Sequence, residues 1–391
     1  MIRVAWVVPN TREWIGGLHY FRNLLGALFT LENRRVEPVI VGSAAALPAP
    51  FDRCPTIPAP CGARPFLDKV RDNVGRRFLD NGGLLARELR RQNIGLLSHA
   101  AWLGRRSPVP ALCWIPDFQH RHLPLCFDKA ECRDRDVTQK AAARHAQAVV
   151  LSSEAARRDF ERLYPKARCP VHVLRFVAHA PDPAALPPAD EVLARHGIDE
   201  PFFHIPNQVW AHKNHAVVIE ALGLLAGKGR PPLVVSTGRT SDYRRPEHFA
   251  SLAERLRTAG LADRLRFLGL IPYAEAAVLM RTSLALINPS FFEGWSTTVE
   301  EAKSLGKRIL LSDIAVHREQ NPARGMFFDP TDPARLAAVM AEVLETHNLR
   351  EERAEAERAA AETPGRLRRF AEAYEEIVLD VVDRHGRARS E

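Results

Sequence analysis

Short apolar runs alternate with helical patterns almost from end to end of this chain, and this order limits the folds that it can adopt. Runs such as Ile2–Val8 and Leu233–Ser236 are apolar at nearly every position, which is typical of strands covered on both faces. Segments with helical periodicity, for example His215–Ala226, separate these runs. This order favours parallel sheets whose two faces are covered by helices.

The alternation is interrupted at Ala180–Asp190, a stretch rich in Pro and Ala that fits a linker. A chain of 391 residues also exceeds one ordinary domain. We therefore predict an α/β protein with two Rossmann-like, doubly wound parallel-sheet domains, residues 1–185 and 186–362, that face a cleft. The last segment, 363–391, contains a long amphipathic helix over Thr363–Arg384. Ligands of such sheets bind beyond the carboxyl ends of the strands, so the site is expected in the loops that follow strands.

Two of these loops have features that could bind an anion. Gly16 and Gly17 open a helix after the first strand and expose backbone N–H groups, although a plain tight turn fits equally well. Lys213 stands just before the helix that begins at His215, where a cation opposes the helix dipole. A phosphate between the lysine and the helix would remove this conflict. The alternative is a solvated lysine.

The third loop, Asn288–Ala302, runs from a strand through a turn into a helix. Glu293 and Glu301 stand on either side of the helix N-terminus, and Thr297 with Glu300 fits a capping box. The N–H groups of such a helix can take a phosphate, while the two carboxylates can accept hydroxyl groups such as the vicinal diol of a ribose. The alternative is two surface glutamates.

Five segments resemble those of one known family: Trp14–Tyr20, Trp114–His120, Pro206–His215, Glu293-x7-Glu301 with Asn288–Ser290 before it, and Val316–Glu319. The family is that of the retaining GT-B glycosyltransferases of family 4, and the resemblance is to bacterial members that build surface polysaccharides, including lipopolysaccharide. It implies the transfer of a hexose, with mannose as one candidate, from a GDP- or UDP-linked sugar to a saccharide or lipid-linked acceptor, with retention. The final helix of the family crosses back onto the first domain.

The resemblance also implies roles for individual residues. Glu301 would hold the ribose hydroxyls, Glu293 would lie near the transferred sugar, and Lys213 would neutralise the diphosphate. Asp117 completes the candidate catalytic set, and Asp117 and His120 are the candidates on the acceptor side. The full set of candidate donor-binding residues is Gly16, Gly17, Gln208, Lys213, Ile271, Glu293, Gly294, Trp295, Ser296, Thr297, Thr298 and Glu301.

Two positions depart from the family pattern. Gln208 stands where the family usually has an Arg five residues before its Lys, which leaves Arg239 or another Arg to replace that charge, and Pro116 stands where a His often precedes the Asp. Two alternatives therefore remain: a nucleotide-sugar epimerase of the same fold and a non-catalytic module that binds a nucleotide sugar. No Asp-x-Asp motif stands at the end of a predicted strand, so we expect no metal and no cofactor, with Lys213 and the helix N-terminus at Thr297 in the place of a metal. The base, sugar, acceptor and linkage stay open.

Charge is concentrated in the first half of the chain. Residues 1–190 hold 28 Lys and Arg against 18 Asp and Glu, whereas residues 191–391 hold 27 against 29. This excess of positive charge would suit binding to an anionic partner, or it could serve solubility alone.

The stripe of apolar residues in Pro65–Leu79 could either bind an anionic membrane or pack on its own domain. Basic residues do not cluster with aromatic ones, so we expect no nucleic acid. Without a signal peptide or a long apolar run, we expect a cytoplasmic protein, in peripheral contact with the membrane if Pro65–Leu79 binds it.

Overall fold

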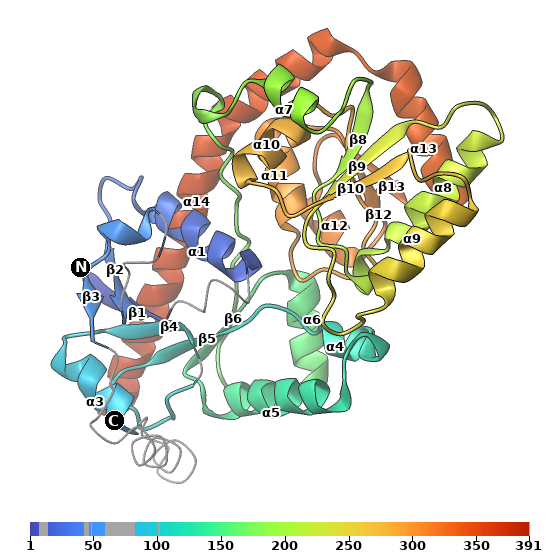
Figure 1. Cartoon of the computed structure of the whole chain (residues 1–391). Helices are drawn as coiled ribbons and strands as arrows, with labels where there is room; N and C mark the ends of the chain where they lie inside the picture. Colours follow the sequence, from blue (N-terminus) through green and yellow to red (C-terminus); the bar gives the residue numbers. More distant parts are fainter. Residues whose placement is uncertain (8–14, 43–46, 48, 59–82, 101, 391) are drawn as a thin grey trace. The chain divides into compact units, whose positions relative to one another are not determined.

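The chain folds into two compact units (Figure 1). The computed structural model describes residues 1–7, 15–42, 47, 49–58, 83–100 and 102–390. Unit 1 comprises Met1–Phe118, Lys129–Val177 and Gly365–Glu391, and unit 2 comprises Gln119–Asp128 and Ala178–Pro364. The predicted divisions lie after residues 185 and 362, and the assignment of Gln119–Asp128 to unit 2 has no counterpart in the prediction.

Unit 1 is built on a seven-stranded parallel sheet in the order β3-β2-β1-β4-β5-β6-β7. The strands are β1 Ile2–Trp6, β2 Val36–Val41, β3 Thr56–Ile57, β4 Leu96–Ala100, β5 Ala111–Ile115, β6 Ala148–Leu151 and β7 Val171–Val173. The helices are α1 Ile15–Leu28, α3 Gly83–Arg91, α5 Lys129–His145, α6 Glu154–Leu163 and the second part of α14, which spans Leu349–Ser390.

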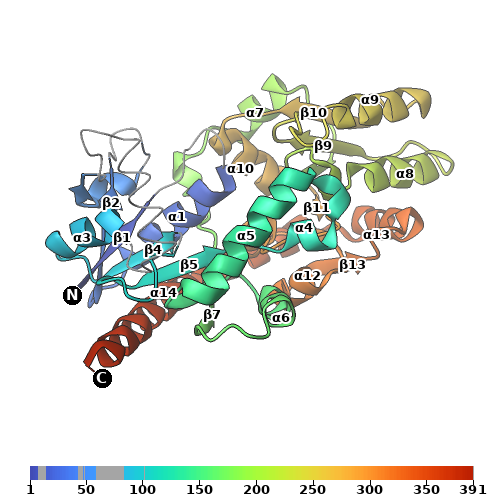
Figure 2. The ribbon, with the colours of Figure 1, turned by 90° about the horizontal axis from the view of Figure 1, so that it is seen from below.

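The alternation of side chains along β1 decides which helices cover which face of this sheet. Ala5 belongs to a buried cluster with Leu89 of α3. The next residue, Trp6, faces the other way and its ring lies 5.5 Å from that of Phe21 in α1 and 5.8 Å from that of Tyr374 in α14. Helices α3, α5 and α6 therefore cover one face, and α1 and the end of α14 cover the other (Figures 1 and 2).

Polar contacts fix α14 to the edge of β2. The Glu375 carboxylate is almost completely buried and its Oε1 accepts the backbone N–H groups of Arg35, at 2.6 Å, and Val36, at 2.9 Å. Its Oε2 lies 3.1 Å from Arg35 Nε. The neighbouring Tyr374 hydroxyl accepts from Trp6 Nε1 and donates to Ser98 Oγ, both at 2.9 Å. One helix thus satisfies buried polar groups on three strands, β1, β2 and β4.

Unit 2 is built on a six-stranded parallel sheet in the order β10-β9-β8-β11-β12-β13. The strands are β8 Phe202–Ile205, β9 Leu233–Thr237, β10 Leu265–Gly269, β11 Leu286–Asn288, β12 Ile309–Ser312 and β13 Gly325–Phe328. The helices are α4 Gln119–His122, α7 Ala189–Arg195, α8 His215–Ala226, α9 His248–Thr258, α10 Tyr273–Thr282, α11 Thr297–Leu305, α12 Ala315–Gln320, α13 Pro333–Thr346 and the first part of α14.

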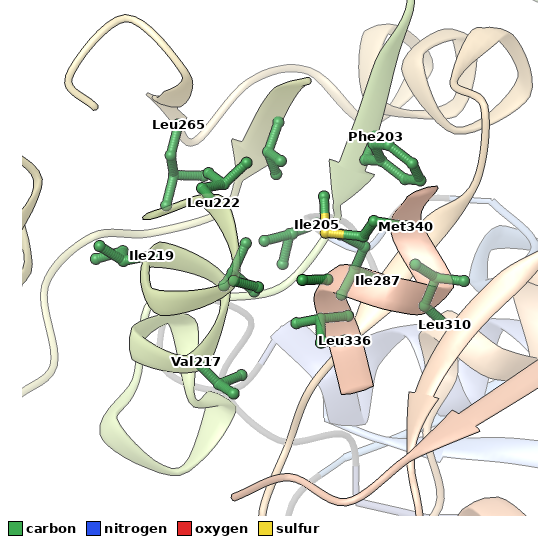
Figure 3. Close-up of a cluster of buried hydrophobic side chains, with 14 of the residues drawn as sticks. Phe203, Ile205, Val217, Ile219, Leu222, Leu265, Ile287, Leu310, Leu336 and Met340 are labelled. Carbon is green, nitrogen blue, oxygen red and sulfur yellow. The ribbon is translucent and has the colours of Figure 1, made fainter. Parts of the chain in front are cut away.

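The core of unit 2 lies on both faces of its sheet. On one face Phe203, Ile287 and Leu310 pack with side chains of α8 and α13, such as Leu222 and Met340 (Figure 3). On the other face α7, α10 and α11 cover the sheet through two further buried clusters. This double cover explains why the strands are apolar at consecutive positions.

The prediction of two parallel-sheet α/β domains is confirmed, because every pairing between the described strands is parallel. Strand β13 was not among the predicted strands, and α14 begins at Leu349 rather than at the predicted Thr363. The added turns of α14 are anchored by charge rather than by an apolar stripe, since Glu352 pairs with Lys307 at 2.9 Å and with Arg324 at 2.6 Å. Residues 8–14 and the predicted amphipathic segment 65–79 lie outside the described residues.

No helix in the described ranges combines the length and the apolar character needed to span a bilayer.

The contact of Glu375 with β2 predicts a large effect on stability. Glu375→Ala leaves two buried N–H groups without their acceptor, and we expect the free energy of unfolding to fall by about 2 kcal/mol or more. Urea unfolding followed by circular dichroism measures this change. The matched control is Glu372→Ala on the same helix, whose exposed pair with Arg368 should contribute less than about 1 kcal/mol. Equal losses in the two variants would contradict this account of α14.

Candidate active site

The loops that follow β8, β9 and β11 meet at one edge of the unit 2 sheet, because these strands are neighbours in it. The loop after β8 ends in a 3₁₀ turn, Ala211–Lys213, and Asn214 then takes a left-handed conformation with φ of 54° before α8 begins. The Asn214 side chain donates to the carbonyls of Pro289, at 3.2 Å, and Pro330, at 2.8 Å. These contacts hold Lys213 beside the loop that follows β11.

Lys213 and Glu293 form a largely buried ion pair. The distance from Lys213 Nζ to Glu293 Oε1 is 2.6 Å, and the side chains retain only 16% and 10% of their exposure. Burial by itself raises the pKa of Glu293, but the charge of Lys213, with smaller effects of His317 and His212, outweighs it and holds this pKa at about 2. Glu293 is therefore a carboxylate at neutral pH, with its charge compensated by the lysine.

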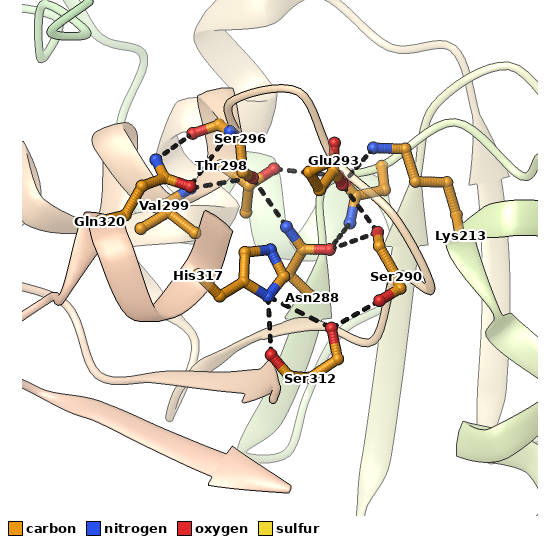
Figure 4. A network of polar contacts seen from close by, with 11 residues as sticks. Lys213, Asn288, Ser290, Glu293, Ser296, Thr298, Val299, Ser312, His317 and Gln320 are labelled. Carbon is orange, nitrogen blue, oxygen red and sulfur yellow. Dashed lines mark hydrogen bonds and ion pairs between the residues drawn. The ribbon is translucent and has the colours of Figure 1, made fainter. Parts of the chain in front are cut away.

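A buried polar network continues from this pair to the start of α11 (Figure 4). Ser290 Oγ lies 2.7 Å from both Glu293 Oε1 and Asn288 Oδ1. The Asn288 amide donates to Ser296 Oγ at 2.7 Å, and the Thr298 hydroxyl donates to Asn207 Oδ1 at 2.9 Å. The network thus connects the ends of β8 and β11 with the first turn of α11.

The first turn of α11 differs from the sequence prediction. The N-cap is Ser296, whose Oγ accepts from the Val299 N–H, so the predicted capping box of Thr297 and Glu300 is wrong. Glu300 instead lies 3.2 Å from Lys303 Nζ. The physical reason is Gln320 of α12, whose side-chain amide accepts from the Ser296 N–H at 3.1 Å and donates to the Ser296 carbonyl at 2.9 Å and to Glu300 Oε1 at 3.1 Å.

Two N–H groups of this turn remain available. Among the described residues, the backbone N–H groups of Thr297 and Thr298 have no acceptor, as is usual for the first positions of a helix. The Ser296 N–H, by contrast, is already bonded to Gln320. Thr297 and Thr298 can therefore present their N–H groups to an anion near the Lys213–Glu293 pair, and Ser296 serves as the cap.

Glu301 has a different partner, on α10. The Tyr273 hydroxyl donates to Glu301 Oε1 at 2.9 Å, and Glu301 keeps 8% of its surface exposed. Burial raises the pKa of Glu301 to about 7, although the Tyr273 hydrogen bond acts in the opposite direction. Ile271 stands two residues before Tyr273 and packs partly buried against the cluster around Val192. Glu301 is thus held separately from the network of Glu293.

Four further predicted residues belong to other elements of the fold. Gly16 and Gly17 fall in the first turn of α1, in unit 1. Asp117 also belongs to unit 1, where its carboxylate accepts from Arg135 at 3.3 Å. His120 lies in α4, which belongs to unit 2, and its buried ring is 6.3 Å from that of Phe127.

Sequence reasoning missed several residues that build the site, namely Asn207, Gly238, Tyr273 and Gln320. Gly238 follows β9 with φ of +133°, and a Cβ atom there would lie 2.6 Å from the Asn207 carbonyl oxygen. The next residue, Arg239, accepts the Val209 N–H at 2.9 Å, directly beside Gln208. Glycine is therefore required where the loop after β9 touches the loop after β8. Its signal in the sequence is a Gly directly after an apolar strand.

In the described part of the chain, no three His, Cys, Asp or Glu side chains converge as metal ligands do.

Residues 191–360 match the family described as glycosyl transferases group 1. This segment covers most of unit 2, including every residue of the Lys213–Glu293 network. A comparison of the sequence with curated proteins gives no match.

Solved structures share the fold of nearly the whole chain. A glycosyltransferase from Rickettsia africae ESF-5 has a TM-score of 0.70 at 17% identity, covering 97% of this chain and 98% of that one. Alr3699/HepE of Anabaena, solved with UDP and glucose, has a TM-score of 0.69 at 15% identity, with 97% and 100% covered. Sucrose-phosphate synthase from Thermosynechococcus elongatus has a TM-score of 0.64 at 15% identity, with both chains fully covered. The two parallel-sheet domains match the GT-B fold of these structures, as predicted.

The close approach at Gly238 predicts that this position tolerates no side chain. Gly238→Ala forces an unfavourable φ and a contact with the Asn207 backbone, so we expect the free energy of unfolding to fall by about 2 kcal/mol or more. The control is Gly223→Ala, inside α8, where a Cβ meets nothing within 4 Å and should stabilise the helix by about 0.4–1 kcal/mol. Thermal unfolding of both variants measures the difference. A neutral Gly238→Ala would show that the two loops are not in contact.

Proposed function

We propose that this protein transfers a hexose from a GDP- or UDP-linked sugar to a saccharide or lipid-linked acceptor, with retention and without a metal or cofactor. The observation that carries the proposal is the buried Lys213–Glu293 pair beside the unbonded N–H groups of Thr297 and Thr298. The match of residues 191–360 to glycosyl transferases group 1 and the UDP bound by the Anabaena protein of similar fold support it.

The transfer breaks the bond between the anomeric carbon and the oxygen of the diphosphate. The electron pair leaves with the diphosphate, and the acceptor oxygen forms the new bond as its hydroxyl loses a proton. Lys213 and the N-terminus of α11 would offset the charge that develops on the diphosphate, which is the contribution a metal makes elsewhere. Both routes to retention stay open: front-face attack, with the proton passing to a leaving phosphate oxygen, and a covalent intermediate.

Lys213 would exchange partners when the donor binds. In the structure its ammonium group is paired with Glu293, whereas the diphosphate of a nucleotide sugar carries two negative charges. Once the lysine turns to the phosphate, Glu293 keeps its hydrogen bond from the Ser290 hydroxyl at 2.7 Å. Glu293 is a carboxylate in the structure, and a carboxylate beside the transferred sugar would stabilise the positive charge that develops there. Glu301 would meanwhile accept the ribose hydroxyls.

The remaining assignments of the proposal rest on sequence. Gly16 and Gly17 would approach the diphosphate, and Asp117 and His120 would act on the acceptor side. A mannosyl donor, a role in bacterial surface polysaccharide such as lipopolysaccharide, a cytoplasmic location and contact of residues 65–79 with an anionic membrane belong to the same proposal. It includes no nucleic acid.

The exposed Lys228 offers a matched control for the role of Lys213. Calorimetric titration with UDP-glucose and GDP-mannose in the presence of EDTA should show binding of one donor, and Lys213→Ala should weaken it roughly 10- to 100-fold because a charge-assisted contact is lost. Lys228→Ala should bind like the wild type. Loss of binding in EDTA would overturn the metal-free site. Conversion of the donor without acceptor, seen by NMR, would indicate an epimerase, and binding without any turnover would indicate a binding module.

The partner exchange predicts opposite effects of one substitution on binding and on transfer. Glu293→Gln removes the charge that holds Lys213, so affinity for the nucleoside diphosphate should stay equal or rise severalfold. Transfer should fall roughly 100-fold or more, because no carboxylate remains beside the sugar. Calorimetry and initial rates measure the two effects, with the exposed Glu342→Gln in α13 as control. A parallel loss of both properties would mean that Glu293 only supports the loop.

A further inference from the structure

We propose that Tyr273 is the residue that positions Glu301 for recognition of the ribose diol, through the hydrogen bond from its hydroxyl to Glu301 Oε1. The inference rests on the proposed function, in which Glu301 accepts the ribose hydroxyls of the donor. Its basis is the 2.9 Å contact between α10 and α11, together with the burial of the carboxyl group at the end of that contact.

The packing of the Tyr273 ring directs its hydroxyl group toward Glu301. Tyr273 is the first residue of α10, and its ring packs, partly buried, against the cluster that contains Ala277, Val299 and Ala302. The last two of these residues belong to α11, the helix that carries Glu301. The same apolar contact that joins the two helices therefore directs the tyrosine hydroxyl at the carboxyl group, with little rotamer freedom left to lose.

The bond leaves one carboxyl oxygen for a ligand. Tyr273 occupies Oε1, and no hydrogen bond within the described residues involves Oε2. The 8% of Glu301 that stays exposed lets a hydroxyl group approach. A carboxyl held at one oxygen presents the other in a single direction, which is what selection of a hydroxyl at a fixed position requires.

This arrangement has a measurable consequence for specificity. When a ligand lacks the hydroxyl group that a buried acceptor normally binds, the acceptor is left without a hydrogen-bond partner. Such sites therefore bind the deoxy analogue much more weakly. The wild-type protein should bind its ribonucleotide sugar at least about tenfold more tightly than the 2′-deoxyribose form. Without the Tyr273 hydroxyl, Glu301 gains rotamer freedom and this preference should shrink.

The test compares Tyr273→Phe with Tyr243→Phe, since Tyr243 is 68% exposed in the same unit. UDP-glucose and GDP-mannose, each with its 2′-deoxyribose analogue, are the calorimetric probes. We expect Tyr273→Phe to cut the preference for ribose at least fivefold, mainly by weakening the ribose form, and Tyr243→Phe to leave it unchanged. An undiminished preference in Tyr273→Phe, or an equal loss for both forms, would overturn the positioning role.

A second variant separates this inference from the proposed function. Glu301→Gln should remove the preference for ribose, and adding Tyr273→Phe to it should change nothing further, because the hydroxyl acts through the carboxyl. A further loss in the double variant would overturn the proposal even if Tyr273→Phe alone folded poorly. A wild-type protein that binds the donor without any preference for ribose would overturn the role of Glu301 itself, and a protein that binds no donor would overturn the proposed function.

Discussion

Two opposite charges, Lys213 and Glu293, are buried together at the edge of the unit 2 sheet. Contacts of the surrounding loops hold the two side chains in this position. A buried carboxylate without a partner would take up a proton, whereas this one is stabilised by a lysine and by the Ser290 hydroxyl. The network of Asn207, Asn288 and Ser296 fixes the loops that carry the pair. Such a network is stable only when its members are satisfied, and this gives the site a defined geometry.

The parallel topology makes this concentration of polar groups possible. Because β8, β9 and β11 run in the same direction, their following loops emerge at one edge, and residues about 80 positions apart in sequence come into hydrogen-bond contact. Close approach then requires glycine at two points. Gly238 lets the loop after β9 touch Asn207, and Gly306 ends α11 with φ of +64°, where a Cβ would lie 2.2 Å from the Glu355 carbonyl oxygen in α14.

Two glutamates of one motif have acquired opposite ionisation behaviour from their surroundings. Glu293 faces a lysine and has a pKa near 2, while Glu301 faces a tyrosine hydroxyl in an apolar setting and has a pKa near 7. In the proposed transfer, Glu293 would supply negative charge near the sugar and Glu301 would hydrogen-bond to neutral hydroxyl groups.

The amino-acid pattern was enough to predict the two parallel-sheet domains, the positions of the loops after β8 and β11, and the closeness of Lys213 and Glu293 to helix N-termini. Hydrophobic periodicity and Pro and Gly punctuation are local properties, so they can be read without tertiary structure. The capping of α11 by Ser296 could not be predicted in this way, because it depends on a contact with Gln320 on another helix. The same holds for Tyr273 beside Glu301, for the need for Gly238, and for α14 turns held by Glu352, since each depends on a partner distant in sequence. A pattern along one chain carries no information about which distant side chain will meet it.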